Sequence, residues 1–204
     1  MKVALINGSP HEKGCTYTAL REVQKQLEKR DIESTITWIG TEPTRGCIGC
    51  YACKQTGTCV FPDEAYNKIS KEIHSANGVV LGSPVYYASI NGTFSAILDK
   101  VFFSAGQEFQ YKLGAAVVSC RRGGASASFD QINRYFTVKR MPIVSSQYWN
   151  SVHGNTPEEV MQDEEGLQTM RTLADNMAWM LKSLQKSEIS PYPEGEQIST
   201  NFIR

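Results

Sequence analysis

The sequence lacks a charge excess of either sign, because 21 lysines and arginines balance 21 aspartates and glutamates among its 204 residues. Proteins that bind nucleic acid or anionic membranes usually carry a basic surface, so we expect neither as a partner. The chain also has no apolar run that approaches the roughly 20 residues of a membrane-spanning helix. Its first apolar run, residues 3–6, is too short for the core of a signal peptide. We therefore expect a cytoplasmic protein.

Two nucleotide-binding motifs are also missing. The chain contains neither the G-x-G-x-x-G fingerprint of dinucleotide-binding folds nor the G-K-[ST] end of a P-loop. It shows no internal repeat and no low-complexity tract. With 41% hydrophobic and 21% charged residues, the composition is that of an ordinary globular protein, and the length fits one sizeable domain.

Cysteine is scarce except in one stretch, where four of the six cysteines follow the spacing C-x2-C-x2-C-x5-C. They are Cys47, Cys50, Cys53 and Cys59. Core packing does not require such clustering, whereas steps of three residues resemble the runs that ligate iron–sulfur clusters. A tetrahedral zinc usually draws on two pairs set farther apart. The spacing favours a [4Fe–4S] cluster, with zinc or disulfide-forming redox thiols as alternatives.

Short apolar runs alternate with amphipathic segments along the whole chain. We predict strands at residues 3–6, 34–39, 77–82, 112–120 and 142–145. The helices predicted between and after them cover residues 17–30, 63–73, 93–103, a segment ending near 136, and 167–184. Residues 83–92 are expected to form a long loop and residues 147–166 to be irregular. This alternation predicts a parallel sheet covered by helices on both faces.

Three loops of the predicted fold end at the same edge of the sheet. The first is rich in glycine and hydroxyl side chains and opens a helix, which suits a phosphate. The second carries the adjacent tyrosines Tyr86 and Tyr87, and the third is the glycine loop that follows Arg121. Ligands of parallel sheets bind outside the carboxyl ends of the strands. A phosphate grip, an aromatic wall and a polar rim together suit FMN.

These motifs resemble a known family. Gly8-Ser9-Pro10 with Gly14 and Thr16, Ser83-Pro84-Val85-Tyr86, and the four-cysteine run resemble the flavodoxin-like NADPH-dependent FMN reductases, and in particular their iron–sulfur flavoprotein branch. The resemblance implies an α/β fold with a doubly wound, five-stranded parallel sheet in the order 2-1-3-4-5 and helices on both faces. It also implies an FMN-binding domain over residues 1–186, a cysteine-rich insertion at 45–62 and an extended C-terminal tail at 187–204.

The same resemblance assigns site residues, although it assigns no catalytic acid or base. The FMN phosphate would contact Ser9, His11, Cys15 and Thr16; the isoalloxazine would contact Pro84, Val85, Tyr86 and Tyr87; its polar edge would contact Ser119, Arg121, Gly123 and Gly124. The four clustered cysteines would ligate the [4Fe–4S] cluster. Two positions depart from the family pattern, because His11 stands where arginine is usual and Cys15 where a small polar residue, often asparagine, is common.

The function implied is an electron relay between FMN and the cluster, with NAD(P)H as a possible transient co-substrate or a ferredoxin-type protein as redox partner. Two alternatives remain open at this stage. One is a cluster-free NAD(P)H-dependent reductase of FMN, quinones or nitro compounds. The other is a non-enzymatic redox sensor that uses zinc or thiols on the same scaffold. By analogy with the family, we expect a homodimer or homotetramer.

Overall fold

The structure, a computed structural model, describes residues 1–188, 190–191, 195 and 200. Six strands form the sheet: β1 Lys2–Asn7, β2 Glu33–Trp38, β3 Gly78–Tyr86, β4 Ser89–Ile90, β5 Leu113–Cys120 and β6 Ser151–His153. The helices are α1 Cys15–Glu28, α2 Cys53–Thr56, α3 Glu64–Ser75, α4 Gly92–Ser104, α5 Ala125–Val138, α6 Pro157–Val160 and α7 Glu164–Lys186. The tail expected from residue 187 onwards lies mostly outside the described residues.

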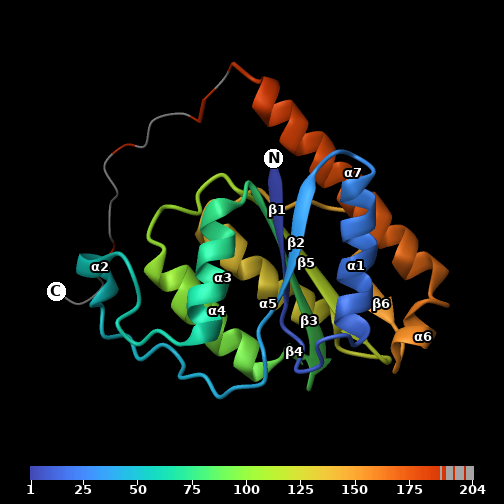
Figure 1. Ribbon diagram of the computed structural model, residues 1–204, viewed down its shortest axis with the longest axis horizontal. Coiled ribbons are helices and arrows are strands. Elements are labelled where there is room, and N and C mark those ends of the chain that lie inside the picture. The colour runs from blue at the N-terminus through green and yellow to red at the C-terminus, as the bar shows by residue number, and fades with distance from the viewer. Residues whose placement is uncertain (189, 192–194, 196–199, 201–204) are drawn as a thin grey trace.

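The predicted α/β fold is confirmed, with a parallel sheet between two layers of helices (Figure 1). Strands β2, β1, β3, β5 and β6 lie side by side in that order and are parallel. The short β4 adds an antiparallel partner to the end of β3. The order therefore reads 2-1-3-5-6, and differs from the predicted 2-1-3-4-5 by this extra strand.

The fifth parallel strand was predicted in the wrong place. Around residue 143 the chain forms only an isolated bridge to Gly114, and the paired strand is β6, eight residues further on. Between the two contacts, the Asn150 side chain donates from Nδ2 to the Ala116 carbonyl at 2.9 Å. An amide side chain thus takes the place of a missing backbone partner along this edge of β5.

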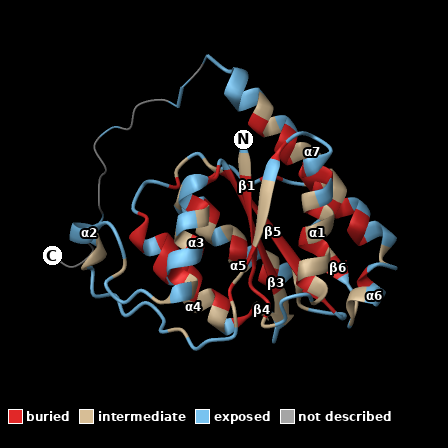
Figure 2. Ribbon diagram, in the orientation of Figure 1, coloured by how far each residue is buried: buried red, intermediate tan, exposed pale blue. Residues whose placement is uncertain are grey.

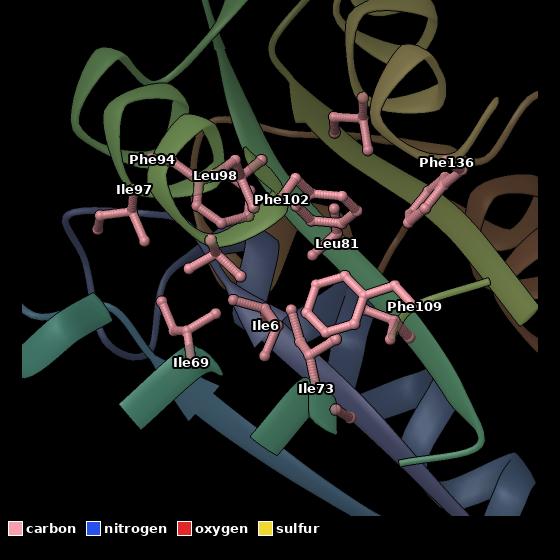
Figure 3. Packing of buried hydrophobic residues seen from close by; sticks show 14 of the residues in the cluster. Ile6, Ile69, Ile73, Leu81, Phe94, Ile97, Leu98, Phe102, Phe109 and Phe136 are labelled. Carbon is pink, nitrogen blue, oxygen red and sulfur yellow. The ribbon is translucent and has the colours of Figure 1, made fainter. Parts of the chain in front are cut away.

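Each face of the sheet packs against its own set of helices because side chains alternate along every strand. In β1, Ala4 and Ile6 face α3, α4 and α5, whereas Val3 and Leu5 face α1 and α7. Figure 3 shows the first of these cores, with Ile6 and Leu81 of the sheet against side chains such as Phe102 of α4. Within the described part of the chain, no helix is both long enough and apolar enough to cross a membrane.

Candidate functional site

The loop after β1, residues 8–14, is held in shape by two side chains from neighbouring strands. Asn7 is fully buried; its Oδ1 accepts from the Ser9 amide at 3.1 Å, and its Nδ2 donates to the Glu12 carbonyl at 2.9 Å. From the end of β2, the Trp38 indole donates to the Ser9 carbonyl at 2.8 Å. Sequence reasoning missed both residues. Asn7 could have been recognised because a polar side chain at the end of a buried strand must find hydrogen-bond partners.

The first turn of α1 is open toward this loop. Its N-cap is Gly14, which offers no side-chain acceptor, so no side chain caps the first backbone N–H groups of the helix. These groups and the positive end of the helix dipole can receive an anion. A pocket of about 520 Å³ lies against the outer side of the loop. It is lined by Pro10, His11, Glu12, Lys13, Gly14, Cys15, Trp38, Asn155, Thr156 and Pro157.

The predicted phosphate residues differ in how far they are exposed. His11 is exposed, whereas the Ser9 hydroxyl is buried and accepts from the His11 amide at 3.1 Å. Thr16 is buried too, and its hydroxyl lies 2.8 Å from that of Ser119. Burial raises the pKa of the Cys15 thiol, whose sulfur lies 3.8 Å from the Gly154 carbonyl oxygen. Cys15 therefore adds no thiolate charge that would repel a phosphate.

The segment expected as a long loop at 83–92 is instead a β-hairpin. Strand β3 continues through Pro84 and Val85 to Tyr86, and β4 returns antiparallel to it. The two turn residues, Tyr87 and Ala88, have φ values of 51° and 58°. Because the turn contains no glycine, its sequence gave no hairpin signal. Tyr86 is 44% exposed and Tyr87 fully exposed, so both rings are open to a ligand.

The loop after β5 packs directly against this hairpin. Gly124 has φ +89°, and a Cβ there would lie 2.8 Å from the Ala88 Cα and 2.9 Å from Val85 Cγ1. Gly123, by contrast, borders open space. Arg121, two residues earlier in the same loop, is exposed. Only glycine at position 124 allows the two loops to touch, which places the backbone of this loop beside the tyrosine turn.

The structure brings the three predicted loops to one edge of the sheet. Asn7 pairs with Gly82 and Pro84 pairs with Ser119, so β1, β3 and β5 end side by side. The contact between Thr16, in the first turn of α1, and Ser119, near the end of β5, joins the elements beside the first and third loops across 103 residues of sequence. The result is an open helix end, an aromatic hairpin and a glycine loop around one edge.

The cysteine segment, residues 45–62, leaves the end of β2 and runs along the outer side of α4 (Figure 1). One small pocket of about 20 Å³ is lined by all four clustered cysteines. Its other walls are Gly46, Ile48, Tyr51, Val60, Phe61, Lys100, Phe103 and Ser104. Left-handed backbone at Gly49, Tyr51 and Gly57 turns the segment back on itself. Four cysteines within a mostly apolar wall are a suitable ligand set for an iron–sulfur cluster.

The four thiols are not yet arranged for a metal. Across residues 1–188 and the few described beyond, no group of three or more His, Cys, Asp or Glu side chains is placed to hold a metal ion. Cys47 and Cys50 are exposed, and Cys53 and Cys59 are half-buried. The residue types fit a cluster, but its binding would have to bring the four sulfurs together around it.

The fold and its edge loops define a flavodoxin-like α/β protein. Comparison with known families specifies this further, because a family model described as NADPH-dependent FMN reductase matches residues 1–156. The chain belongs to the NADPH-dependent FMN reductase family. The resemblance noted in its motifs is therefore confirmed.

Individual relatives agree with this assignment. An iron-sulfur flavoprotein of Methanocaldococcus jannaschii is 30% identical over 194 residues, which cover 91% of this chain and 100% of that relative. RosB, solved with bound 8-demethyl-8-formylriboflavin-5'-phosphate, superposes with a TM-score of 0.76 at 12% identity, over 100% of this chain and 92% of RosB. The rubredoxin oxygen:oxidoreductase of Desulfovibrio gigas gives a TM-score of 0.63 at 18% identity over 91% of this chain, which spans only 37% of that protein. The two structural likenesses show the fold alone.

Proposed function

We propose that the chain is an FMN-dependent oxidoreductase that relays electrons between FMN and a [4Fe–4S] cluster held by its four clustered cysteines. The observation that carries the flavin part is the convergence of the three loops at one edge of the sheet. The Thr16–Ser119 contact joins α1 to β5 there, and Gly124 packs against the hairpin. Bound FMN would supply two-electron and one-electron chemistry, and a bound cluster one-electron chemistry only. The chain itself would bind, orient and tune both groups.

The protein groups have distinct tasks in this proposal. Backbone N–H groups in the first turn of α1, aided by Ser9 and His11, would bind the FMN phosphate. The rings of Tyr86 and Tyr87 would pack against the isoalloxazine. Backbone donors near Gly123 would stabilise negative charge on the polar edge of the reduced ring. Hydride transfer needs no protein acid or base, and we assign none.

The cluster part is supported by the shared pocket of the four cysteines and by the relatives named iron-sulfur flavoproteins. Anaerobic purification tests it together with the flavin part. We expect about one flavin per chain, iron and sulfide near four per chain, and broad absorbance near 400 nm beyond the flavin bands. A colourless protein that takes up no added FMN would contradict the whole proposal.

A second candidate is the same flavoprotein without a cluster, reducing flavins, quinones or nitro compounds with NAD(P)H. The absence of a preformed group of metal ligands in the described residues favours it. The sequence has no dinucleotide-binding motif beside the proposed FMN site, so the exposed tyrosine hairpin would have to admit a nicotinamide transiently. Flavin bands alone, with no iron or sulfide after anaerobic reconstitution, would select this candidate. Reduction by NADH, NADPH or reduced ferredoxin, measured on the purified protein, would identify the electron donor.

The flavin site itself is tested by Tyr87→Ala. Because Tyr87 is fully exposed, its removal leaves the core intact. Loss of one stacked ring costs about 1 kcal/mol, so we expect the FMN dissociation constant to rise roughly fivefold. The matched control is Tyr111→Ala. Tyr111 is also an exposed tyrosine (41%) with a positive φ, 64°, but it precedes β5 and so lies at the opposite edge of the sheet, away from the proposed flavin site. Equal affinities for the two variants, measured by flavin fluorescence titration, would argue against this ring position.

We also propose that the chain assembles as a homodimer or homotetramer. Support comes from large apolar side chains that are exposed both near the sheet edge, at Tyr148 and Trp149, and in the cysteine segment, at Ile48 and Phe61. Light scattering on the cofactor-loaded protein tests this, and a monomer would contradict it. The cytoplasmic location stays a prediction.

A further inference from the structure

A lysine lies buried beneath the cysteine pocket. Lys100 of α4 is only 2% exposed, yet it lines the same small pocket as the four cysteines. Lysine is almost never fully buried unless its charge is paired. The hydrogen-bond partners of Lys100 therefore indicate the role of its charge.

Lys100 ties together the two ends of the cysteine segment. Its Nζ donates to the Asp63 carboxylate and, at 2.9 Å, to the Thr44 hydroxyl. Thr44 in turn donates to Asp63, and these two residues stand directly before and after the segment. Asp63 also caps α3 by accepting from the Tyr66 amide at 2.8 Å. A single ammonium thus closes the base of the segment onto α3 and α4.

The network reaches the fourth cysteine through Tyr66. Lys100 Nζ lies 5.8 Å from the centre of the Tyr66 ring. The Tyr66 hydroxyl accepts from the Cys59 amide at 2.9 Å and lies 2.8 Å from the Ser104 hydroxyl of α4. The backbone of Cys59 is therefore fixed to the same helix that carries the ammonium.

The two partners of the ion pair line different pockets. Lys100 lines the cysteine pocket, whereas Asp63 and Thr44 line a separate pocket of about 290 Å³ on the other side. Burial alone would raise the pKa of Asp63, but hydrogen bonds from Lys100, Thr44 and the Tyr66 amide hold it below its ordinary value. The carboxylate is thus ionised, and of the two partners only Lys100 lines the pocket of the four cysteines.

We propose that Lys100 is a positioning residue for the cysteine site, which sets the shape of the segment and makes a bound cluster easier to reduce. This inference rests on the cluster of the proposed function. A cube held by four thiolates is anionic and gains one further negative charge on reduction. Reduction adds one electron, supplied by the redox partner, and breaks no bond. A fixed cation inside an apolar wall stabilises the more negative state.

The test uses the full chain, reconstituted anaerobically with iron and sulfide, and compares it with Lys100→Met. At a fixed potential set with dithionite and mediators, we expect the ratio of reduced to oxidised cluster to be about tenfold lower in Lys100→Met. For one electron this corresponds to a reduction potential about 59 mV lower. Lys100→Arg keeps the charge and should restore most of the ratio. Lys68→Met, an exposed lysine on α3 beside the other pocket, should leave it unchanged.

Each outcome separates the inference from the proposed function. If the unaltered chain takes up no iron and sulfide, both the cluster part of the proposed function and this inference are overturned. If it does, and Lys100→Met has the same ratio and cluster content, the inference alone is overturned. If Lys100→Met keeps flavin but takes up no cluster, while Lys100→Arg takes it up, the positioning role is supported. Flavin content reports throughout that the sheet has folded.

Discussion

At the scale of single residues, the loop after β1 depends on the absence of a side chain at Gly8. A Cβ at Gly8 would lie 2.2 Å from Cδ1 of Phe94, whose ring is part of the core beneath the loop. We expect Gly8→Ala to lower the free energy of unfolding by about 1–3 kcal/mol, because the ring or the loop must move. Displacement of the loop should also weaken FMN binding. Denaturant unfolding and flavin titration measure the two effects.

The control for this prediction is Gly92→Ala. Gly92 begins α4, and a Cβ there would meet nothing within 4 Å. Alanine favours a helix more than glycine does, so this variant should be as stable as the parent or slightly more stable. Similar losses for both variants would show that the contact with Phe94 is not the cause.

A second residue-scale prediction concerns acid stability. The Lys2 ammonium, 2.9 Å away, lowers the pKa of Glu72 against the opposing effect of burial, and the Thr35 hydroxyl adds to the lowering. A carboxyl group whose pKa is lowered by folding stabilises the protein above its unfolded pKa. That contribution is lost as the pH falls through the folded value. We expect Glu72→Gln to cost up to about 1 kcal/mol at pH 7.

The gap between Glu72→Gln and the unaltered protein should narrow as the pH falls below about 4.3, the ordinary pKa of glutamate, and close below the lowered folded-state pKa. Denaturant unfolding at pH 7, 4 and 3 measures it. A gap that stays constant over this range would show that Glu72 acts through packing and not through its charge.

At the scale of elements, the tyrosine hairpin stores strain at its turn. Left-handed backbone at a non-glycine residue costs about 1–2 kcal/mol, and Tyr87 and Ala88 both adopt it. We expect Ala88→Gly to raise the free energy of unfolding by about 1 kcal/mol and to leave FMN affinity unchanged. Tyr87→Gly should relieve similar strain but weaken FMN binding, since it removes a ring. If Ala88→Gly weakened binding as much, the turn geometry and not the ring would hold the flavin.

The elements show which parts of the fold can be predicted from sequence. The buried strands were found because short apolar runs such as 3–6 and 77–82 have few other structural options. The hairpin was missed because Tyr87 and Ala88 carry no turn signal. The fifth strand was misplaced because the apolar residues near 143 make one bridge, while the paired strand owes its place to the Asn150 side chain.

The motifs of the candidate site could be predicted from the sequence, but the tertiary contacts that hold those motifs in place could not. Glycine-rich loops after apolar strands can be recognised in the sequence, and the structure brings the expected loops together. Contacts such as Trp38 to Ser9, or Lys100 to Asp63, join positions 29 and 37 residues apart and depend on tertiary packing. Nothing in the local sequence of Lys100 distinguishes it from a solvated lysine. Contacts of this kind can be recognised only in the three-dimensional structure.

At the scale of the whole molecule, the chain divides into a buried sheet and an exposed strip. Figure 2 shows buried residues along the sheet and its covering helices, whereas the cysteine segment is exposed or intermediate. Residues 40–63, all of which the structure describes, include no buried residue. The two cores contain the strands and the long helices, and the segment adds only the half-buried Cys59 at their border. Folding of the sheet should therefore not need the cluster.

This separation leads to a prediction for a variant with all four clustered cysteines replaced by serine. Because the segment buries so little, we expect its free energy of unfolding to change by less than about 1 kcal/mol and its flavin content to stay the same, while bound iron and sulfide disappear. Leu81→Ala, in the core at 0% exposure, should instead cost about 2–5 kcal/mol. Denaturant unfolding with flavin, iron and sulfide analysis measures all of this. An unfolded or flavin-free serine variant would mean that the cluster helps to build the fold, as structural metals do in small domains, and that flavin and cluster sites are not independent.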